Sequence, residues 1–339
     1  MMPLMRVSVY LKKKKGNADK ARSEKYEVAP FALSLNETFG LVSLAFGNLG
    51  PLLKTFQTTQ SLVQAIIPGS SPLLQLPYFD NRVVKSVERG SRHLTVQEFM
   101  KIPEEKRRSL TVGLLSEEKY VAAVSVARQM PVLEISKAFF KVAGEKVITP
   151  SSLVQLVIKA RFIPPGATNV PEVSTVDLED ADPDEDDIDA FMGRKSSKSS
   201  EEMAQPALAN APYLCRDYSP RWNIVMGDSV HMKLAVPPFH FTQFDKPIVN
   251  AAGDYTYNVQ TLRMQFQGPP QVGDFKFTVY VLCDSYIGLD SQIDVTLPVE
   301  DPAKAVSLEE DDISEPDEGE YIYIYMLLID SNHQKRVER

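Results

Sequence analysis

The segment that most constrains the fold runs from Phe275 to Val299 and reads FKFTVYVLCDSYIGLDSQIDVTLPV. Large apolar side chains occupy every second position before its centre and again after it. This period of two places one set of side chains on one face of an extended strand. The sequence between the two arms, Asp284–Asp290, is polar and contains a glycine, which is typical of a turn. We therefore expect an antiparallel hairpin, and its residues offer no catalytic grouping.

Other alternating segments extend this hairpin into a larger antiparallel structure. One of them is irregular because Lys137 and Phe140 break its alternation, and 154–162 has the pattern of a half-buried strand. Gly227 and Asp228 are expected to form a turn. The expected strands are 133–142, 154–162, 222–226, 230–236, 262–266 and the two arms of the hairpin. About seven strands at this spacing predict an all-β sandwich of the fibronectin type III or immunoglobulin-like kind.

The first part of the chain has a helical period instead. Asp80 is expected to cap a helix that Gly90 ends, and Thr95 with Glu98 has the spacing of a capping box. Pro131 ends the last helix. The fold class is therefore α+β and multidomain, with helices before the sandwich.

Composition changes suggest the boundaries of these parts. We assign an irregular N-terminus to 1–35, a helical bundle remnant to 36–71 and a helix-loop-helix to 72–131. The sandwich takes 132–301, with a disordered acidic insertion at 170–207, because that stretch has too few apolar residues to offset its ordering entropy. An acidic tail and irregular C-terminus occupy 302–339, where the YIYIYMLLID stretch is either an extra strand or an irregular end.

Composition and motifs argue against an enzyme. The net charge of −8 argues against a nucleic-acid-binding surface spread over the whole protein. The four histidines have no metal-ligand spacing. No phosphate-binding glycine loop or nucleophile elbow occurs, so we expect no catalytic residues, cofactor or metal. Two cysteines, Cys215 and Cys283, do not make a disulfide framework, and Cys283 is expected to be a buried thiol. No uninterrupted apolar run reaches the roughly 18 residues that cross a bilayer.

Two sets of candidate site residues follow from these patterns. Aromatic side chains on a predicted loop and the turn before it are candidate partner contacts, since binding residues concentrate on loops; they are Phe239, Phe241, Phe244 and Asp228. Three serines have an acidic residue three positions on, which suits an acidophilic kinase. These candidate phosphorylation sites are Ser199, Ser307 and Ser314.

A basic group on the helical module has two interpretations. Lys101, Lys106, Arg107 and Arg108 either contact phosphates or form an ordinary solvated helix face. Helix-hairpin-helix proteins that bind DNA need a glycine-rich hairpin, and paired glycines do not occur here. We favour the solvated face.

Three segments together resemble the Sec-sixty-three family, whose members are subunits of the endoplasmic-reticulum protein-translocation complex. They are 50–79, containing GPLL, LVQA and SPLLQLPYF; 222–228; and 275–299 with its DSYIGLD turn. The resemblance implies a helical bundle, a helix-loop-helix and a fibronectin type III sandwich. It also implies a non-enzymatic role on the cytosolic face of the endoplasmic-reticulum membrane, supporting post-translational import. The expected partners are the Sec-sixty-one channel, docked on the sandwich, and a Sec-sixty-two-type subunit, bound by the acidic tail.

Family members also carry membrane helices and a luminal J domain whose His-Pro-Asp motif stimulates a chaperone. This sequence contains neither, so we do not expect J-dependent activity from it. The same domain occurs in Ski2-like RNA helicases, where it would bind RNA or regulate the motor. The acidic stretch, the negative charge and the lack of a motor in this sequence favour the translocation family over that alternative.

Overall fold

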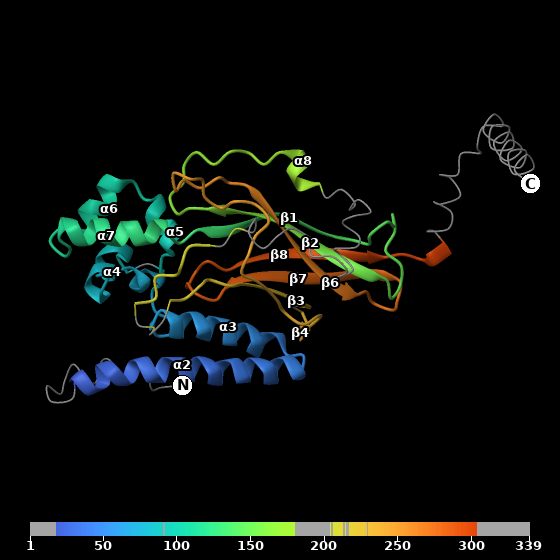
Figure 1. Ribbon diagram of the computed structural model, residues 1–339, viewed down its shortest axis with the longest axis horizontal. Coiled ribbons are helices and arrows are strands. Elements are labelled where there is room, and N and C mark those ends of the chain that lie inside the picture. Colours follow the sequence, from blue (N-terminus) through green and yellow to red (C-terminus); the bar gives the residue numbers. More distant parts are fainter. Residues whose placement is uncertain are drawn as a thin grey trace, which may run out of the picture.

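A computed structural model describes residues 18–179 and 204–303, except 91, 205, 213, 215, 216 and 229, with side chains described from Val28 onward. Two long helices lie along one side of a pair of antiparallel sheets, and a group of short helices lies at one end of the sheets (Figure 1). The helices are α2 (Ala18–Ala45), α3 (Leu49–Val63), η1 (Pro72–Gln75), α4 (Asn81–Glu88), α5 (Val96–Lys101), α6 (Glu104–Thr111), α7 (Glu117–Arg128) and α8 (Thr175–Leu178).

The predicted helix ends of the short helices are confirmed. The Asp80 side chain accepts hydrogen bonds from the amides of Arg82 and Val83 at the start of α4. Thr95 and Glu98 form the reciprocal capping box of α5. These caps satisfy amides that have no partner inside the helix, so a local sequence signal was sufficient to place them.

The expectation of an irregular N-terminus is wrong from Ala18 onward, where α2 begins. Helices are normally recognised by a large apolar face that becomes buried. The buried side chains of α2 are instead small or polar, namely Ala29, Asn36 and Ser43. The predicted disorder from 170 is also wrong at its start, because α8 forms there, and 180–203 lies outside the described residues.

The strands form two antiparallel sheets. The first has the order β1 (Val132–Lys141), β2 (Leu153–Ile163), β6 (Val259–Gln267). The second has the order β4 (Lys233–Leu234), β3 (Trp222–Asp228), β7 (Gly273–Cys283), β8 (Ser291–Val299), with β5 (Phe239–Phe241) also paired to β3. The hairpin of β7 and β8 is confirmed, with Phe275 opposite Leu297 and Val279 opposite Ile293.

Several strand details differ from the expectation. Gly227 and Asp228 belong to β3, and the strand expected at 230–236 is reduced to β4. The Asp228 carboxylate accepts the amides of Val230 and His231, which turns the chain after β3. The broken alternation of β1 reflects a register shift between Ile135 and Lys137. The expectation of a half-buried strand at 154–162 is wrong, because β2 is buried on both faces from Val154 to Ala160; β2 is also the central strand of its sheet.

The main core lies between the two sheets and continues into the short helices. Phe162 of β2 packs edge-on against Trp222 of β3 and against Phe244, with ring centroids 5.8 and 4.8 Å apart. A smaller cluster of Leu49, Leu52, Val225 and Leu282 attaches α3 to β3 and β7. α2 packs on α3, so α2 is the outer helix of this side (Figure 1).

Candidate functional site

The turn between β7 and β8 is a buried joint between parts of the molecule. Asp284 and Tyr286 expose 2% and 3% of their surface, and Ser285 is fully buried. The turn faces α3 and η1, which precede it by more than 200 residues. A polar turn is normally at the surface, so its burial requires partners for its backbone groups.

Three glutamine side chains supply most of those partners. Gln60 of α3 donates to the Cys283 carbonyl at 2.7 Å, and Gln64 donates to the Ser285 carbonyl at 2.7 Å. Gln75 of η1 both donates to the carbonyl and accepts from the amide of Ile287, at 2.9 and 3.1 Å. Each amide group can donate and accept, so it can replace the strand-like pairing that a turn lacks. These glutamines were not among the candidate site residues predicted from the sequence, although a glutamine at a buried helical position is an available signal.

Asp284 is the polar centre of the turn. Its carboxylate accepts the Tyr218 hydroxyl at 2.9 Å and the Ser285 hydroxyl at 2.8 Å. It also accepts the backbone amide and Nε of Arg221, at 2.9 and 2.7 Å. Burial, followed by the nearby Asp284 charge, raises the pKa of Tyr218, so this hydroxyl remains a donor.

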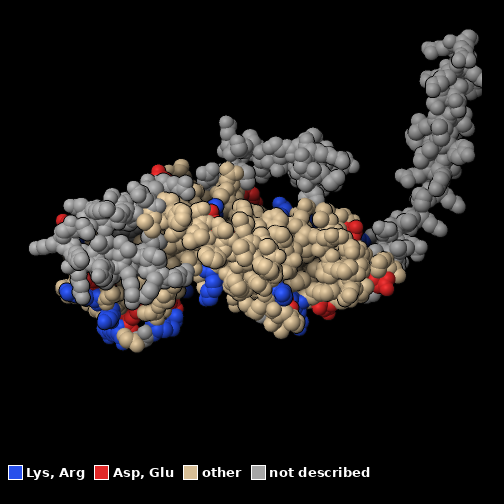
Figure 2. Space-filling model, turned by 90° about the horizontal axis from the view of Figure 1, so that it is seen from below, with Lys and Arg blue, Asp and Glu red and all other residues tan. Residues whose placement is uncertain are grey.

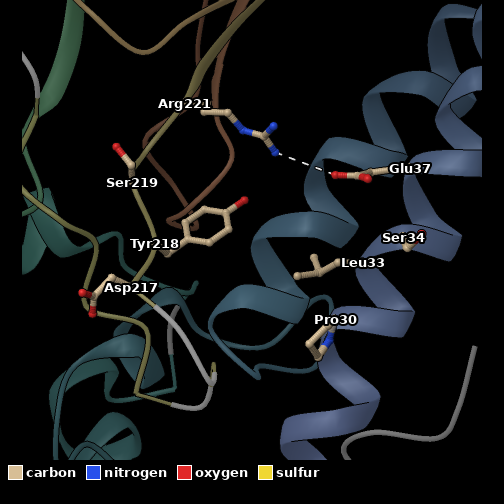
Figure 3. A pocket seen from close by; sticks show the side chains of 8 residues that line it. All are labelled: Pro30, Leu33, Ser34, Glu37, Asp217, Tyr218, Ser219 and Arg221. Carbon is tan, nitrogen blue, oxygen red and sulfur yellow. Dashed lines mark ion pairs between the residues drawn. The ribbon is translucent and has the colours of Figure 1, made fainter.

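A surface cleft of about 360 Å³ lies beside this network, between α2 and the segment before β3 (Figure 3). Arg221 points across it toward Glu37, with 3.9 Å between Nη2 and Oε1. The same guanidinium is bound to Asp284, so its charge is already balanced by two carboxylates. The cleft is lined by Pro30, Leu33, Ser34, Glu37, Asp217, Tyr218, Ser219 and Arg221. Its contacts serve to hold α2 against the sheet rather than to present a free cation.

The candidate partner contacts lie in different environments. Phe244 exposes 1% of its surface, so the expectation of an exposed aromatic is wrong there, because its ring fills the core beside Phe162. Phe239 and Phe241 belong to strand β5, not to a loop, and both are half-buried against the main core. The Asp228 side chain is 32% exposed and forms an ion pair with His231. Partner contact through Phe239, Phe241 and Asp228 stays a prediction.

The two arginines of the basic group on the short helices are engaged within the protein. Arg107 is 6% exposed, lies 5.7 Å from the Phe99 ring centroid and contacts Met100. Arg108 pairs with Glu104 and Glu117. The expectation of a solvated helix face is therefore wrong for Arg107, whereas Lys101 and Lys106 are exposed. Burial and pairing of the two arginines argue against a phosphate-binding surface.

The remaining candidates are a thiol, metal ligands and phosphorylation sites. Cys283 is buried as expected, and burial raises its pKa to about 12. Within the described part of the chain, no group of three or more His, Cys, Asp or Glu side chains has the arrangement of a metal site. Ser199, Ser307, Ser314, Cys215 and the acidic tail from 304 onward lie outside the described residues.

Among the residues that the structure describes, one helix meets the length and composition requirement for crossing a membrane. It is the Val28–Ala45 part of α2, of which 17% is buried. This stretch is not an uninterrupted apolar run, because it includes Asn36 and Glu37. Length and composition alone do not distinguish a membrane span from a helix that packs on protein.

Comparison with known proteins gives three relatives. The chain is 28% identical over 263 residues to Translocation protein sec63 of Schizosaccharomyces pombe, covering 77% of this chain and 40% of that protein. It is 23% identical over 335 residues to Protein translocation protein SEC63 of Saccharomyces cerevisiae, covering 90% of this chain and 48% of that protein. A DExH-box ATP-dependent RNA helicase of Arabidopsis thaliana is 20% identical over 78% of this chain but 10% of its own length. No family model matches the chain.

Proposed function

Since its similarity to two yeast translocation proteins relates this chain to the Sec-sixty-three family, we propose that it is a non-enzymatic part of a protein-translocation complex at the endoplasmic-reticulum membrane. The similarity carries the proposal because it extends over 77% and 90% of this chain. The chain spans less than half the length of either relative. The activity and partners of a whole translocation protein are therefore part of the proposal.

In this proposal the β-sandwich, of fibronectin type III or immunoglobulin-like kind, docks on cytosolic loops of the Sec-sixty-one channel. Phe239, Phe241 and Asp228 are the candidate contacts. The buried joint at Asp284–Asp290 supports such a role because it ties α3 and η1 to the sandwich, so that the helices and sheets act as one platform. A preformed surface loses little conformational entropy on binding.

The acidic tail, 302–339, is proposed to bind a Sec-sixty-two-type subunit. Eight of the fourteen residues in 307–320, SLEEDDISEPDEGE, are aspartate or glutamate. A run of this kind favours a basic partner through steered, salt-sensitive association. Phosphorylation of Ser307 and Ser314 would add negative charge to the same run and is expected to strengthen that binding.

Binding of the purified chain to immobilised channel complex tests the proposal. We expect binding at about 50 mM salt that weakens at about 300 mM, and loss of Sec-sixty-two binding on deletion of 302–320. Phe239→Ala with Phe241→Ala should weaken channel binding, whereas Tyr78→Ala, which removes an aromatic side chain exposed on the helical module, should not. No channel binding at low salt, together with unchanged Sec-sixty-two binding after the deletion, would refute the proposal.

The similarity to an RNA helicase favours a second candidate, an accessory domain that binds RNA. The exposed Lys106 tests it, because Arg107 is buried and its replacement would disturb folding. RNA binding that falls with salt and is lost in Lys106→Ala would support this candidate. Absence of RNA binding at about 50 mM salt would eliminate it.

A further inference from the structure

The outer surface of α2 carries a stripe of six large apolar side chains, here called the α2 stripe. All six are substantially exposed, between 39% for Val28 and 73% for Phe31. The helical hydrogen bonding continues just past α2, with 3.2 Å from the Phe46 amide to the Val42 carbonyl. The α2 stripe consists of Val28, Phe31, Leu35, Phe39, Val42 and Phe46.

The polarity of α2 is reversed relative to an ordinary surface helix. Its buried face holds Asn36, which donates to the Thr55 carbonyl at 2.8 Å and to the Thr59 hydroxyl at 2.9 Å on α3. Ser43 is also on that buried face. A surface helix normally directs its apolar side chains to the core and its polar ones to water. The α2 stripe is therefore an apolar surface with no partner among the described residues.

The α2 stripe is large enough to matter energetically. At about 200 Å² for a phenylalanine side chain, Phe31, Phe39 and Phe46 alone expose about 400 Å². The largest apolar patch on a typical monomer is roughly 300–600 Å², and each partner of a standard interface buries roughly 800 Å². The α2 stripe with its flanking residues approaches that size. Figure 2 views the molecule from the side of α2, and the broad middle of this face is tan.

The α2 stripe is straight and uncharged. Its spacing of 3, 4, 4, 3 and 4 residues keeps the six side chains within an arc of about 80° at 100° per residue. Glu37 is the one charged residue from Val28 to Ala45, and by the same geometry it lies on the opposite side of the helix. It is directed toward Arg221 across the cleft, as Figure 3 shows. No charged residue between Val28 and Phe46 therefore lies on the side of α2 that carries the stripe, and the other charged residues of α2 precede Val28.

The α2 stripe is also complementary to itself. A two-fold axis beside position 37 places a second α2 antiparallel to the first, with Val28 opposite Phe46, Phe31 opposite Val42 and Leu35 opposite Phe39. Every pair then joins one phenylalanine to one aliphatic side chain, so large and smaller residues alternate across the seam as close packing requires. A two-fold interface uses the same patch twice and needs this self-complementarity.

From these observations we propose that a second copy of this chain docks on the α2 stripe, forming an antiparallel α2–α2 dimer. Lipid is a poorer occupant on two grounds. The bonds of Asn36 tie α2 to α3, which packs on β3 and β7, so α2 is not free to span a bilayer. An interfacial membrane helix has Lys and Arg beside its apolar face along its length, whereas the basic residues of α2, Lys20, Arg22 and Lys25, all precede the α2 stripe.

Sedimentation equilibrium of the full chain tests the dimer with two matched variants. Phe39→Glu places a charge within the α2 stripe and should weaken dimerisation by about 100-fold or more. Leu41→Glu places the same charge at another exposed apolar position of α2 that lies outside the stripe, and should leave dimerisation within a few-fold. Both side chains are exposed, so both variants should keep the circular dichroism spectrum and melting temperature of the unmodified chain.

A disulfide test reports the orientation of the two helices. Val28→Cys protein is mixed with Phe46→Cys protein, both carrying Cys215→Ser, and oxidised. The antiparallel dimer predicts a mixed disulfide between the two variants, whereas a parallel pair would give Val28→Cys homodimers. The proposal fails if the chain is monomeric at 100 µM, or if Phe39→Glu and Leu41→Glu dimerise equally. It fails also if the monomer binds neutral phosphatidylcholine vesicles through α2, with Phe39→Glu abolishing that binding.

Discussion

Removal of the Asp284 carboxylate should destabilise the whole domain. The carboxylate accepts four hydrogen bonds, from Tyr218, Ser285 and two groups of Arg221. Asp284→Ala leaves all four donors without this acceptor. The hydroxyls of Tyr218 and Ser285 are buried, so water cannot readily replace it.

The magnitude follows from burial and charge. Removing one partner of a buried ion pair costs about 3–5 kcal/mol, and a hydrogen bond to a charged group contributes about 1.5–3 kcal/mol. The Arg221 side chain is 43% exposed and regains water, which reduces its share. We expect Asp284→Ala to lower the free energy of unfolding by about 3–4 kcal/mol. Asp284→Asn keeps one oxygen acceptor and should cost about 2 kcal/mol.

Thermal unfolding followed by circular dichroism measures these costs. At about 2–4 °C per kcal/mol for a domain of this size, Asp284→Ala should lower the melting temperature by about 10 °C and Asp284→Asn by about 5 °C. Asp217→Ala is the matched control, because Asp217 is an exposed carboxylate of the same segment. The reasoning is refuted if Asp284→Ala and Asp217→Ala melt within about 1 °C of each other.

Three further changes probe the buried groups. Gln64→Ala leaves the buried Ser285 carbonyl without its donor and should lower the free energy of unfolding in urea by about 1–3 kcal/mol. Gln57→Ala, at an exposed position of the same helix, should change it by less than about 0.5 kcal/mol. Equal effects would contradict the role of Gln64 in the buried joint. Phe244→Ala should lower the free energy of unfolding by about 3–5 kcal/mol because the Phe244 ring fills the core. Unchanged stability would instead indicate that Phe244 is a surface residue and a candidate partner contact. Burial alone would raise the pKa of Glu88, but hydrogen bonds from Ser71, His93 and the Leu94 amide hold this pKa below 4.5 in the folded state. The resulting stabilisation is present above pH 4.5 and is lost as pH falls through the folded pKa, so the melting temperature should fall with pH in this range. Glu88→Gln should reduce that fall, and an unchanged dependence on pH would exclude Glu88 as its source.

Local signals predicted the parts of this fold that depend on neighbouring residues. The caps of α4 and α5 and the β7–β8 hairpin are determined by side chains within a few positions of each other, so their spacing is visible in the sequence. The bulge in β1 was visible as well, as the disturbed alternation at Lys137. The expectation that Cys283 is a buried thiol succeeded because it lies on the apolar face of a strand.

Features that depend on distant parts of the chain were missed. Phe244 appeared to be on a polar loop, but its ring meets Phe162, which is 82 residues earlier and on another strand. The first part of helix α2, Ala18–Leu35, was missed because the buried side chains of α2 are small or polar, and their partners on α3 cannot be known from α2 alone. The roles of Gln60, Gln64 and Gln75 likewise became apparent only when the turn was found beside them.

The joint at Asp284–Asp290 has a consequence for how this protein folds and how it can be divided. Its glutamine contacts join residues separated by 223, 221 and 212 positions. Loops of that length close slowly, so these bonds should form late and hold the helices and the sandwich in one cooperative unit. A fragment that ends at Pro131 would retain the three glutamines without their turn, and the matching fragment would contain an unsatisfied turn. The change from helices to strands near Pro131 therefore separates two kinds of secondary structure but not two independently stable units. Cutting the chain there would destabilise both fragments.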